Sequence, residues 1–300
     1  MKTILYLALG TILIVGGFNY ISKVTNANVD TNQVEITEKD GFRLIKANGI
    51  PNHETGKFPN QGNPNRISSQ NYNFKVPLEP KKNEKAIFAP LFGVAINGIP
   101  FDPGTAELWN NDFNWRYEAL TGSINLGVDS SKAHVQPNGA YHYHGIPKGL
   151  VEKLDGTGKV VLVGYASDGF PVYSQFGYTN PNDAKSPLRE LKGSYRIKAG
   201  NRPANSPGGK YDGTFVQDWE YNSELGDLDE CNGRFGVTPE YPKGIYHYYL
   251  TVSYPFIPRC TMGTPDSSFR KMGPPPSGGR PGGRPPMGGP PPNGRPPVEE

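Results

Sequence analysis

The stretch 159-KVVLVGYASDGFPVY-173 decides the fold class. Its first part, residues 159–166, is apolar and rich in β-branched side chains, which fit the pleated surface of a strand. Residues 167–169 (SDG) are turn formers, and residues 170–173 (FPVY) then run back as a second strand. The stretch therefore predicts a β-hairpin.

Further strand patterns lie on both sides of this hairpin. Residues 86–96 (AIFAPLFGVAI) form a nearly unbroken apolar run ending at Asn97-Gly98, as expected of a buried strand followed by a turn. Residues 246–252 (YHYYLTV) also favour a strand, whereas residues 105–119 are compatible with a short helix and a loop. Neither a long amphipathic helix nor an internal repeat of solenoid length is visible. We therefore expect a mainly β fold: a single antiparallel, sheet-rich domain, sandwich or barrel-like, with one or two short helices.

The N-terminal residues 1–27 have the pattern of a targeting segment. Lys2 precedes a run that is apolar from Ile4 to Phe18, which is typical of a secretory signal. If residues up to Ile21 are counted, the run nears the roughly 20 residues that span a bilayer. Residues 4–21 are therefore either part of a cleaved signal or a retained membrane anchor, with a buried helix as a third alternative. The first two interpretations predict an exported protein that is periplasmic, secreted or at the cell surface.

The C-terminal residues 264–300 are expected to be disordered. From Gly273 onward Pro and Gly are too dense for the chain to bury enough surface to offset its ordering entropy. The widely spaced Arg280, Arg284 and Arg295 belong either to a solvated spacer or to a weak contact with cell-wall polymers or lipid.

The chain between these ends divides into a loop-rich section, residues 28–85, and a β domain, residues 86–263. The formal net charge of the whole chain is only +3, and no basic stripe is present. A nucleic-acid partner is therefore not expected. The sequence does not define an oligomeric state.

The two cysteines, Cys231 and Cys260, are the only ones in the chain. An even count in an exported protein favours a disulfide, which here closes a loop of about 30 residues. A pair of metal thiolates is the alternative, although no CxxC spacing supports it.

Three of the five histidines lie close together in 134-HVQPNGAYHYH-144. The turn residues 137–139 (PNG) place His134 and His142 on either side of a chain reversal. Because side chains alternate along a strand, His142 and His144 share one face. These three imidazoles predict a zinc or copper site, with His247 from the later strand as a fourth ligand. The alternative is a polar strand face whose histidines hydrogen-bond to backbone or carboxylate groups.

The same alternation places tyrosines on the opposite face of each strand. Tyr141, Tyr143, Tyr246 and Tyr248 are either core residues or a platform for glycan or peptide recognition. One buried face per strand favours the core.

Acidic residues gather near the first cysteine, in residues 226–244 (GDLDECNGRFGVTPEYPKG). A calcium loop is not expected there, because its fifth position is Cys231 and no glutamate occupies the twelfth. An acidic turn beside the disulfide is the simpler interpretation. Asp168, Asp229 and Glu240 are candidate carboxylates to support the histidine site.

Around AHVQPNGAYHYHGIPKGL the chain resembles the bacterial YHYH-domain proteins, a family named for the tetrapeptide at residues 141–144. The resemblance continues through VGYASDGFPVY (163–173), YDGTFVQDWEY (211–221) and LDECNGRFGVTPEYPKGIYHYYLTVSYPFIPRC (228–260), and it covers about residues 86–263. It implies an exported domain in which the three clustered histidines matter, and it implies no particular reaction. The second tyrosine-rich motif, YHYY, has one histidine, so a symmetrical cage of four histidines is not expected.

These observations favour a metal-binding extracytoplasmic domain. A metal-dependent enzyme of unspecified reaction is one alternative, with His142 or His144 as general base and Asp168 or Glu240 orienting it. The sequence contains neither a nucleophile elbow nor an HExxH motif. A non-catalytic glycan- or protein-binding surface module is the other alternative.

Overall fold

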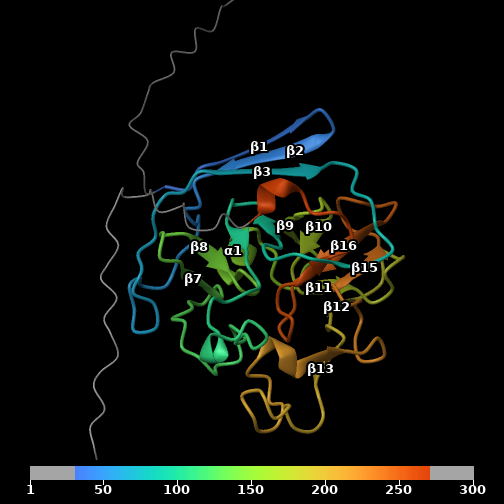
Figure 1. The fold of residues 1–300 in the computed structure, drawn as a ribbon. Helices are drawn as coiled ribbons and strands as arrows, with labels where there is room; N and C mark the ends of the chain where they lie inside the picture. Colours follow the sequence, from blue (N-terminus) through green and yellow to red (C-terminus); the bar gives the residue numbers. More distant parts are fainter. Residues whose placement is uncertain (1–30, 271–300) are drawn as a thin grey trace, which may run out of the picture.

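The computed structural model describes residues 31–270. The expected signal or anchor, residues 1–27, and most of the expected disordered tail lie outside this range. Figure 1 shows a mainly β arrangement, in which a small sheet lies over a larger, curled one. The prediction of a mainly β fold is confirmed. No helix within residues 31–270 is long and apolar enough to cross a membrane.

The larger sheet has eight strands in the order β15-β16-β10-β9-β5-β6-β8-β7. In chain order these are β5 (Gly93–Ala95), β6 (Pro100–Phe101), β7 (Ala133–Val135), β8 (Tyr141–Tyr143), β9 (Leu162–Ala166), β10 (Pro171–Tyr173), β15 (Gly233–Gly236) and β16 (Ile245–Tyr249). Neighbouring strands are antiparallel except for two parallel pairs, β6 with β8 and β10 with β16. The sheet is therefore mixed rather than wholly antiparallel.

The smaller sheet is an antiparallel meander in the section that was expected to be loop-rich. It consists of β1 (Val34–Lys39), β2 (Phe42–Ala47) and β3 (Tyr72–Pro77). Its buried side chains, Ile45, Phe74 and Val76, pack with Val94 of the larger sheet and with Phe269. The Phe74 and Phe269 rings stack with their centroids 4.6 Å apart. Residues up to 270 are thus part of the fold, beyond the expected start of the tail.

The remaining elements are short. Three two-stranded ladders join β4 (Ile87–Phe88) to β17 (Cys260–Thr261), β11 (Phe176–Tyr178) to β12 (Leu188–Glu190), and β13 (Tyr195–Ile197) to β14 (Trp219–Tyr221). The helical elements are α1 (Lys148–Lys153) and the 3-10 turns η1 (Trp109–Asn111), η2 (Val216–Asp218) and η3 (Ser267–Phe269).

The hairpin expected at residues 159–173 forms as β9 and β10. Its turn ends at Gly169, whose φ of 94° is readily adopted by glycine. The single strand expected at residues 86–96 is interrupted instead, giving the exposed β4 and the buried β5. Pro90 lies between them and cannot donate a backbone hydrogen bond to a continuing ladder.

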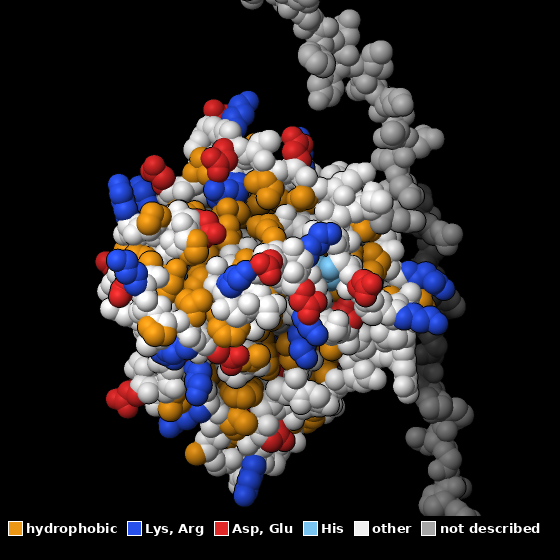
Figure 2. All heavy atoms as spheres, turned by 180° about the vertical axis from the view of Figure 1, so that it is seen from behind, with side chains coloured by type: hydrophobic (Ala, Val, Ile, Leu, Met, Phe, Trp, Pro, Cys, Tyr) orange, Lys and Arg blue, Asp and Glu red, His pale blue; other side chains and the backbone are white. Residues whose placement is uncertain are grey.

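Aromatic residues fill the core of the larger sheet. Tyr141, Tyr143 and Tyr248 are fully buried and Tyr246 is nearly so, all in the main hydrophobic cluster. These rings therefore pack in the core and do not form an exposed platform. Figure 2 shows the opposite face of the molecule, where basic and acidic side chains are interspersed among apolar ones.

The two cysteines form the expected disulfide. Cys231 precedes β15 and Cys260 begins β17, and their Cα atoms lie 5.2 Å apart. The bond thus ties an edge of the larger sheet to the β4–β17 ladder.

Candidate metal centre

The hairpin β7–β8 brings three histidines together at one end of the larger sheet. His134 on β7 is the direct cross-strand partner of His142 on β8. His144 directly follows β8 and lies on the same strand face as His142. The turn between the strands includes Gly139, whose φ is 86°. The expected chain reversal is confirmed.

The three imidazoles converge. Their ring centroids are 4.6 to 4.8 Å apart, and their candidate ligand nitrogens all lie within 4.8 Å of one another. Nε2 of His134 lies 3.1 Å from Nε2 of His144. Two imidazoles on one tetrahedral metal ion, with bonds of roughly 2.0–2.1 Å, have nitrogens about 3.3 Å apart. The spacing therefore suits a shared ion.

Hydrogen bonds from the other ring nitrogens fix two of the rings. Nδ1–H of His134 donates to the Leu126 carbonyl at 2.9 Å, and Nδ1–H of His142 donates to the Ala140 carbonyl at 3.2 Å. In these tautomers each Nε2 carries the lone pair and is the atom that a metal ion would take as its ligand. Metal-binding histidines commonly donate their second N–H to a backbone carbonyl in this way. The donor set thus fits a divalent metal ion.

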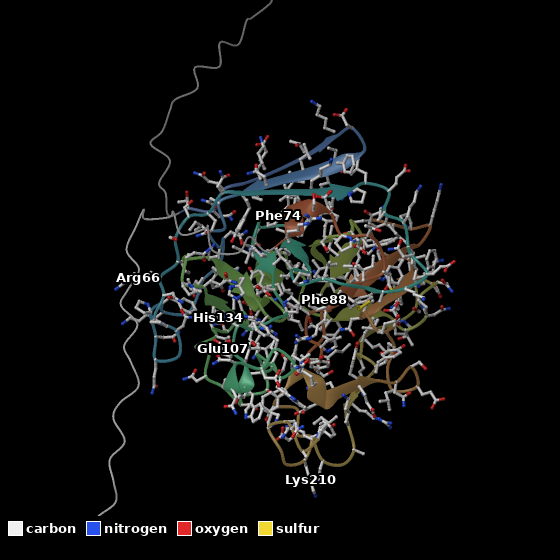
Figure 3. All side chains as sticks on the ribbon, viewed as in Figure 1. Arg66, Phe74, Phe88, Glu107, His134 and Lys210 are labelled. Atoms are coloured by element: carbon white, nitrogen blue, oxygen red, sulfur yellow. A yellow bond between two sulfur atoms is a disulfide. The ribbon has the colours of Figure 1, made fainter. Side chains whose placement is uncertain are left out.

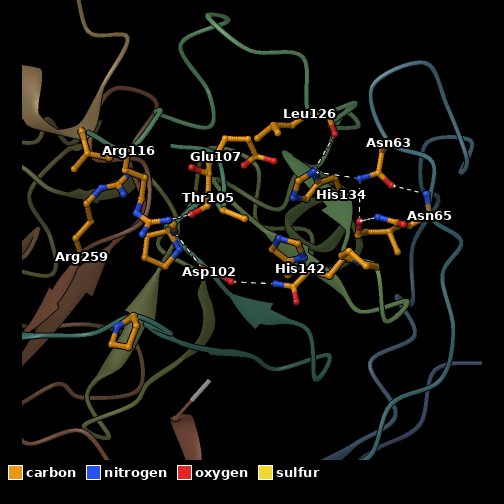
Figure 4. Close-up of a pocket in the computed structure, with 18 of the residues that line it drawn as sticks. Asn63, Asn65, Asp102, Thr105, Glu107, Arg116, Leu126, His134, His142 and Arg259 are labelled. Carbon is orange, nitrogen blue, oxygen red and sulfur yellow. Dashed lines mark hydrogen bonds between the residues drawn. The ribbon is translucent and has the colours of Figure 1, made fainter. Parts of the chain in front are cut away.

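A cavity of about 870 Å³ reaches this cluster (Figure 4). His134 and His142 line the cavity, whereas His144 is only 2% exposed and does not line it. Phe88 and Glu107, from other segments of the chain, lie along the same cavity as His134 (Figure 3). The size is within the range of small-molecule sites. An ion held by the three histidines would have one side toward this space.

The cavity also contains charged groups that sequence reasoning missed. Asp102 directly follows β6, and its backbone N–H donates to the Tyr143 carbonyl beside His142. Its carboxylate accepts from the Gly104 N–H at 3.1 Å and from Gln136 Nε2 at 3.3 Å. The feature of the sequence that could have indicated this residue is an aspartate that directly follows an apolar strand.

Two arginines line the same cavity. Arg116 donates to the Thr105 carbonyl, and Arg259 forms an ion pair with the buried Glu118. Neither arginine stands out in the sequence, because they come from segments that are distant along the chain.

His247 does not join the cluster, which corrects its assignment as a fourth ligand. It lies on β16, and four strands separate β16 from β8 in the sheet. Its Nδ1–H donates to the Ile245 carbonyl at 2.8 Å, and its Nε2 accepts from the Tyr249 hydroxyl at 2.9 Å. Burial lowers the pKa of His247 to about 4. Strand order in a sheet is not visible in the sequence, so the prediction placed the two tyrosine-rich strands side by side although four strands separate them.

The three expected supporting carboxylates are also used elsewhere, and each accepts a hydrogen bond from a buried tyrosine. Tyr248 donates to Asp168 at 2.5 Å, Tyr246 to Asp229 at 2.8 Å and Tyr173 to Glu240 at 2.6 Å. Burial raises the pKa of Asp168 to about 6. All three tyrosines lie on β10 and β16, in the half of the sheet that does not contain the cluster.

A comparison with protein families decides the chain's membership. The model of the family described as YHYH protein matches residues 73–263. The chain belongs to the YHYH family. No curated protein and no solved structure matches it. The YHYH match begins within β3 and ends just after the disulfide, so it includes one strand of the smaller sheet.

Proposed function

We propose that this YHYH protein is exported and binds a zinc or copper ion through His134, His142 and His144. The convergence of their ligand nitrogens within 4.8 Å of one another carries the proposal. Imidazole suits both metals.

The environment of the cluster supports an ion with an accessible coordination position. Three protein ligands leave one position of a tetrahedral ion for water or another molecule. The cavity lies on the side of His134 and His142, so a small molecule entering it would reach the ion.

Metal analysis of protein purified without a histidine tag tests the binding. We expect one ion per chain, and a rise in melting temperature when zinc or copper is added to metal-free protein. A ligand bound at 100 times its Kd adds about 2.7 kcal/mol to the unfolding free energy.

The matched variants are His142→Ala/His144→Ala and His247→Asn. The first should lose both the ion and the metal-dependent rise, whereas the second, outside the cluster, should keep both. Substoichiometric metal, together with melting temperatures that do not respond to either ion in the wild type, refutes the proposal.

Export is supported by the disulfide, since such bonds persist in oxidising compartments. Fractionation of cells that express the full chain tests it, and the mass of the recovered protein distinguishes a cleaved signal from a retained anchor. Recovery of the protein from the cytosol with both cysteines reduced contradicts export.

A metal-dependent enzyme is the second candidate, and the cavity favours it. Asp102 lies in the same cavity as His142, where a carboxylate can take a proton from a molecule bound to the ion. Turnover of an ester, phosphoester or glycan that disappears on chelation and returns with zinc or copper would support this candidate. The Asp102→Asn variant should then retain the metal and lose turnover.

A further inference from the structure

The larger sheet repeats one four-strand arrangement. From one edge to the centre the strands are β7-β8-β6-β5, and from the other edge they are β15-β16-β10-β9. In each half the pairings run antiparallel, parallel, antiparallel. The central strands β5 and β9 are antiparallel, and their register is symmetrical about the pair Val94 and Tyr165. The strand pairing of the sheet is therefore two-fold symmetrical about this central pair.

The central hairpins are equivalent residue by residue. Residues 93–101 read GVAINGIPF and residues 164–172 read GYASDGFPV, so both have Gly, Ala, Gly and Pro at the same places. The turn glycines Gly98 and Gly169 both have positive φ, 80° and 94°. The last residue of each stretch also has an equivalent neighbour, because Phe101 pairs with Tyr143 in one half and Val172 with Tyr248 in the other.

Buried polar contacts repeat as well. Asn97 donates to the Tyr143 hydroxyl at 2.9 Å, and at the equivalent place Tyr248 donates to Asp168 at 2.5 Å. The Asn97 amide is the donor and the Asp168 carboxylate is the acceptor, so the direction of the hydrogen bond differs while the two contacting positions are equivalent.

A second repeated contact supports each edge hairpin. Tyr141 donates to Asp129 at 2.6 Å, and Tyr246 donates to Asp229 at 2.8 Å. Each aspartate also accepts from the backbone N–H groups two and four residues later. The residue three positions after each aspartate has a positive φ, 55° in one half and 54° in the other.

This equivalence relates His142 to His247. Each donates Nδ1–H to the carbonyl two residues earlier, at 3.2 and 2.8 Å. Their cross-strand partners are His134 and Arg234. The histidine of the second half is therefore in the place of a metal ligand, with an arginine where its partner histidine would be.

The third ligand position is occupied by Tyr249, the equivalent of His144. The backbone N–H of each donates to the carbonyl of the residue with positive φ, at 2.7 Å for His144 and 2.9 Å for Tyr249. The Tyr249 hydroxyl lies 2.9 Å from His247 Nε2, and the Arg234 guanidinium lies over the Tyr249 ring at 5.3 Å.

We propose that Arg234, His247 and Tyr249 are a closed counterpart of the metal centre, in which the guanidinium supplies the positive charge in place of an ion. The strand β11 covers this place: a Cβ at Gly177 would lie 2.7 Å from Arg234 Nη2 and 2.8 Å from the Tyr249 hydroxyl. Arg234 also donates to the Tyr178 carbonyl at 2.8 Å. The expected numbers of bound ions rest on the proposed metal-binding function, whereas the equivalence of the two halves does not.

Exchanging the side chains between the two places tests the inference. The Arg234→His/Tyr249→His variant should bind two zinc ions per chain where the wild type binds one. The reciprocal His134→Arg/His144→Tyr variant should bind none. It should still unfold cooperatively in chelator, since the same backbone already holds Arg and Tyr in the other half. The control Arg196→His/Tyr221→His adds two histidines on β13 and β14 and should bind one ion.

Each outcome separates the two proposals. If the wild type binds neither zinc nor copper, the proposed function fails. The equivalence of the two halves is then tested by the His134→Arg/His144→Tyr variant alone, which must still unfold cooperatively in chelator. If the wild type binds one ion and the Arg234→His/Tyr249→His variant binds no more than the control, or does not fold, the counterpart site is refuted. Loss of cooperative unfolding in His134→Arg/His144→Tyr also refutes it.

Discussion

Acidification of the metal-free protein should reduce its unfolding free energy through His247. Burial lowers the pKa of this histidine from 6.5 to about 4 in the folded state. Between these values the unfolded chain takes up a proton that the folded chain does not. The stability is therefore complete above pH 6.5 and is lost as the pH falls toward 4. A difference of about 2.5 pKa units at 1.36 kcal/mol each corresponds to about 3 kcal/mol.

Urea unfolding in chelator at several pH values between 7 and 4 measures this loss. His247→Asn is the matched variant, because its amide can still donate a hydrogen bond locally but does not titrate. Asp168 acts with the opposite sign: burial raises its pKa to about 6, so the folded chain holds its proton and the protein gains stability as the pH falls. Both proteins contain Asp168, so the difference between them isolates His247. Equal pH dependence in the wild type and the variant would refute the reasoning.

Three further predictions concern stability. Replacing both Cys231 and Cys260 by serine should lower the unfolding free energy by roughly 3–4 kcal/mol in urea unfolding, because the bond spans 29 residues; an unchanged midpoint contradicts this. Tyr141→Phe and Tyr246→Phe should each lower the unfolding free energy by about 1–3 kcal/mol in the same assay, because each removes the hydroxyl that donates to a buried aspartate carboxylate. Very unequal losses would count against the equivalence of the two halves of the sheet. Gly177→Ala should lower the unfolding free energy by about 1–3 kcal/mol in thermal or urea unfolding, because the new Cβ would lie 2.7 Å from the Arg234 guanidinium on β15. Wild-type stability of this variant would show that β11 does not pack closely against Arg234.

Local patterns predicted the parts of the site that depend on neighbouring residues. The period of two along β8 placed His142 and His144 on one face and Tyr141 and Tyr143 in the core. The turn formers after His134 were enough to predict the hairpin that pairs it with His142.

Non-local features could not be obtained in this way. The position of His247 depends on the order of eight strands, which no local pattern encodes. Asp102 reaches the cavity because β6 pairs in parallel with β8, and such a pairing joins segments that are distant along the chain. The repeat was also missed, because the equivalent strands are separated by segments of different length and only short stretches, such as 93–101 and 164–172, are similar.

The two halves of the sheet indicate what would distinguish the proposed metal centre from a structural core in this fold. Strand positions and the Nδ1–H hydrogen bond of the central histidine are the same in both halves. They do not by themselves make the proposed metal centre, because in the second half the partners are Arg234 and Tyr249 and the place is covered by β11. What the first half has in addition is two more imidazoles and a cavity of about 870 Å³ beside them. Under the proposed function, the identity of two side chains and access to the cavity therefore set the role of the β7–β8 hairpin, while the tyrosines common to both halves maintain the fold.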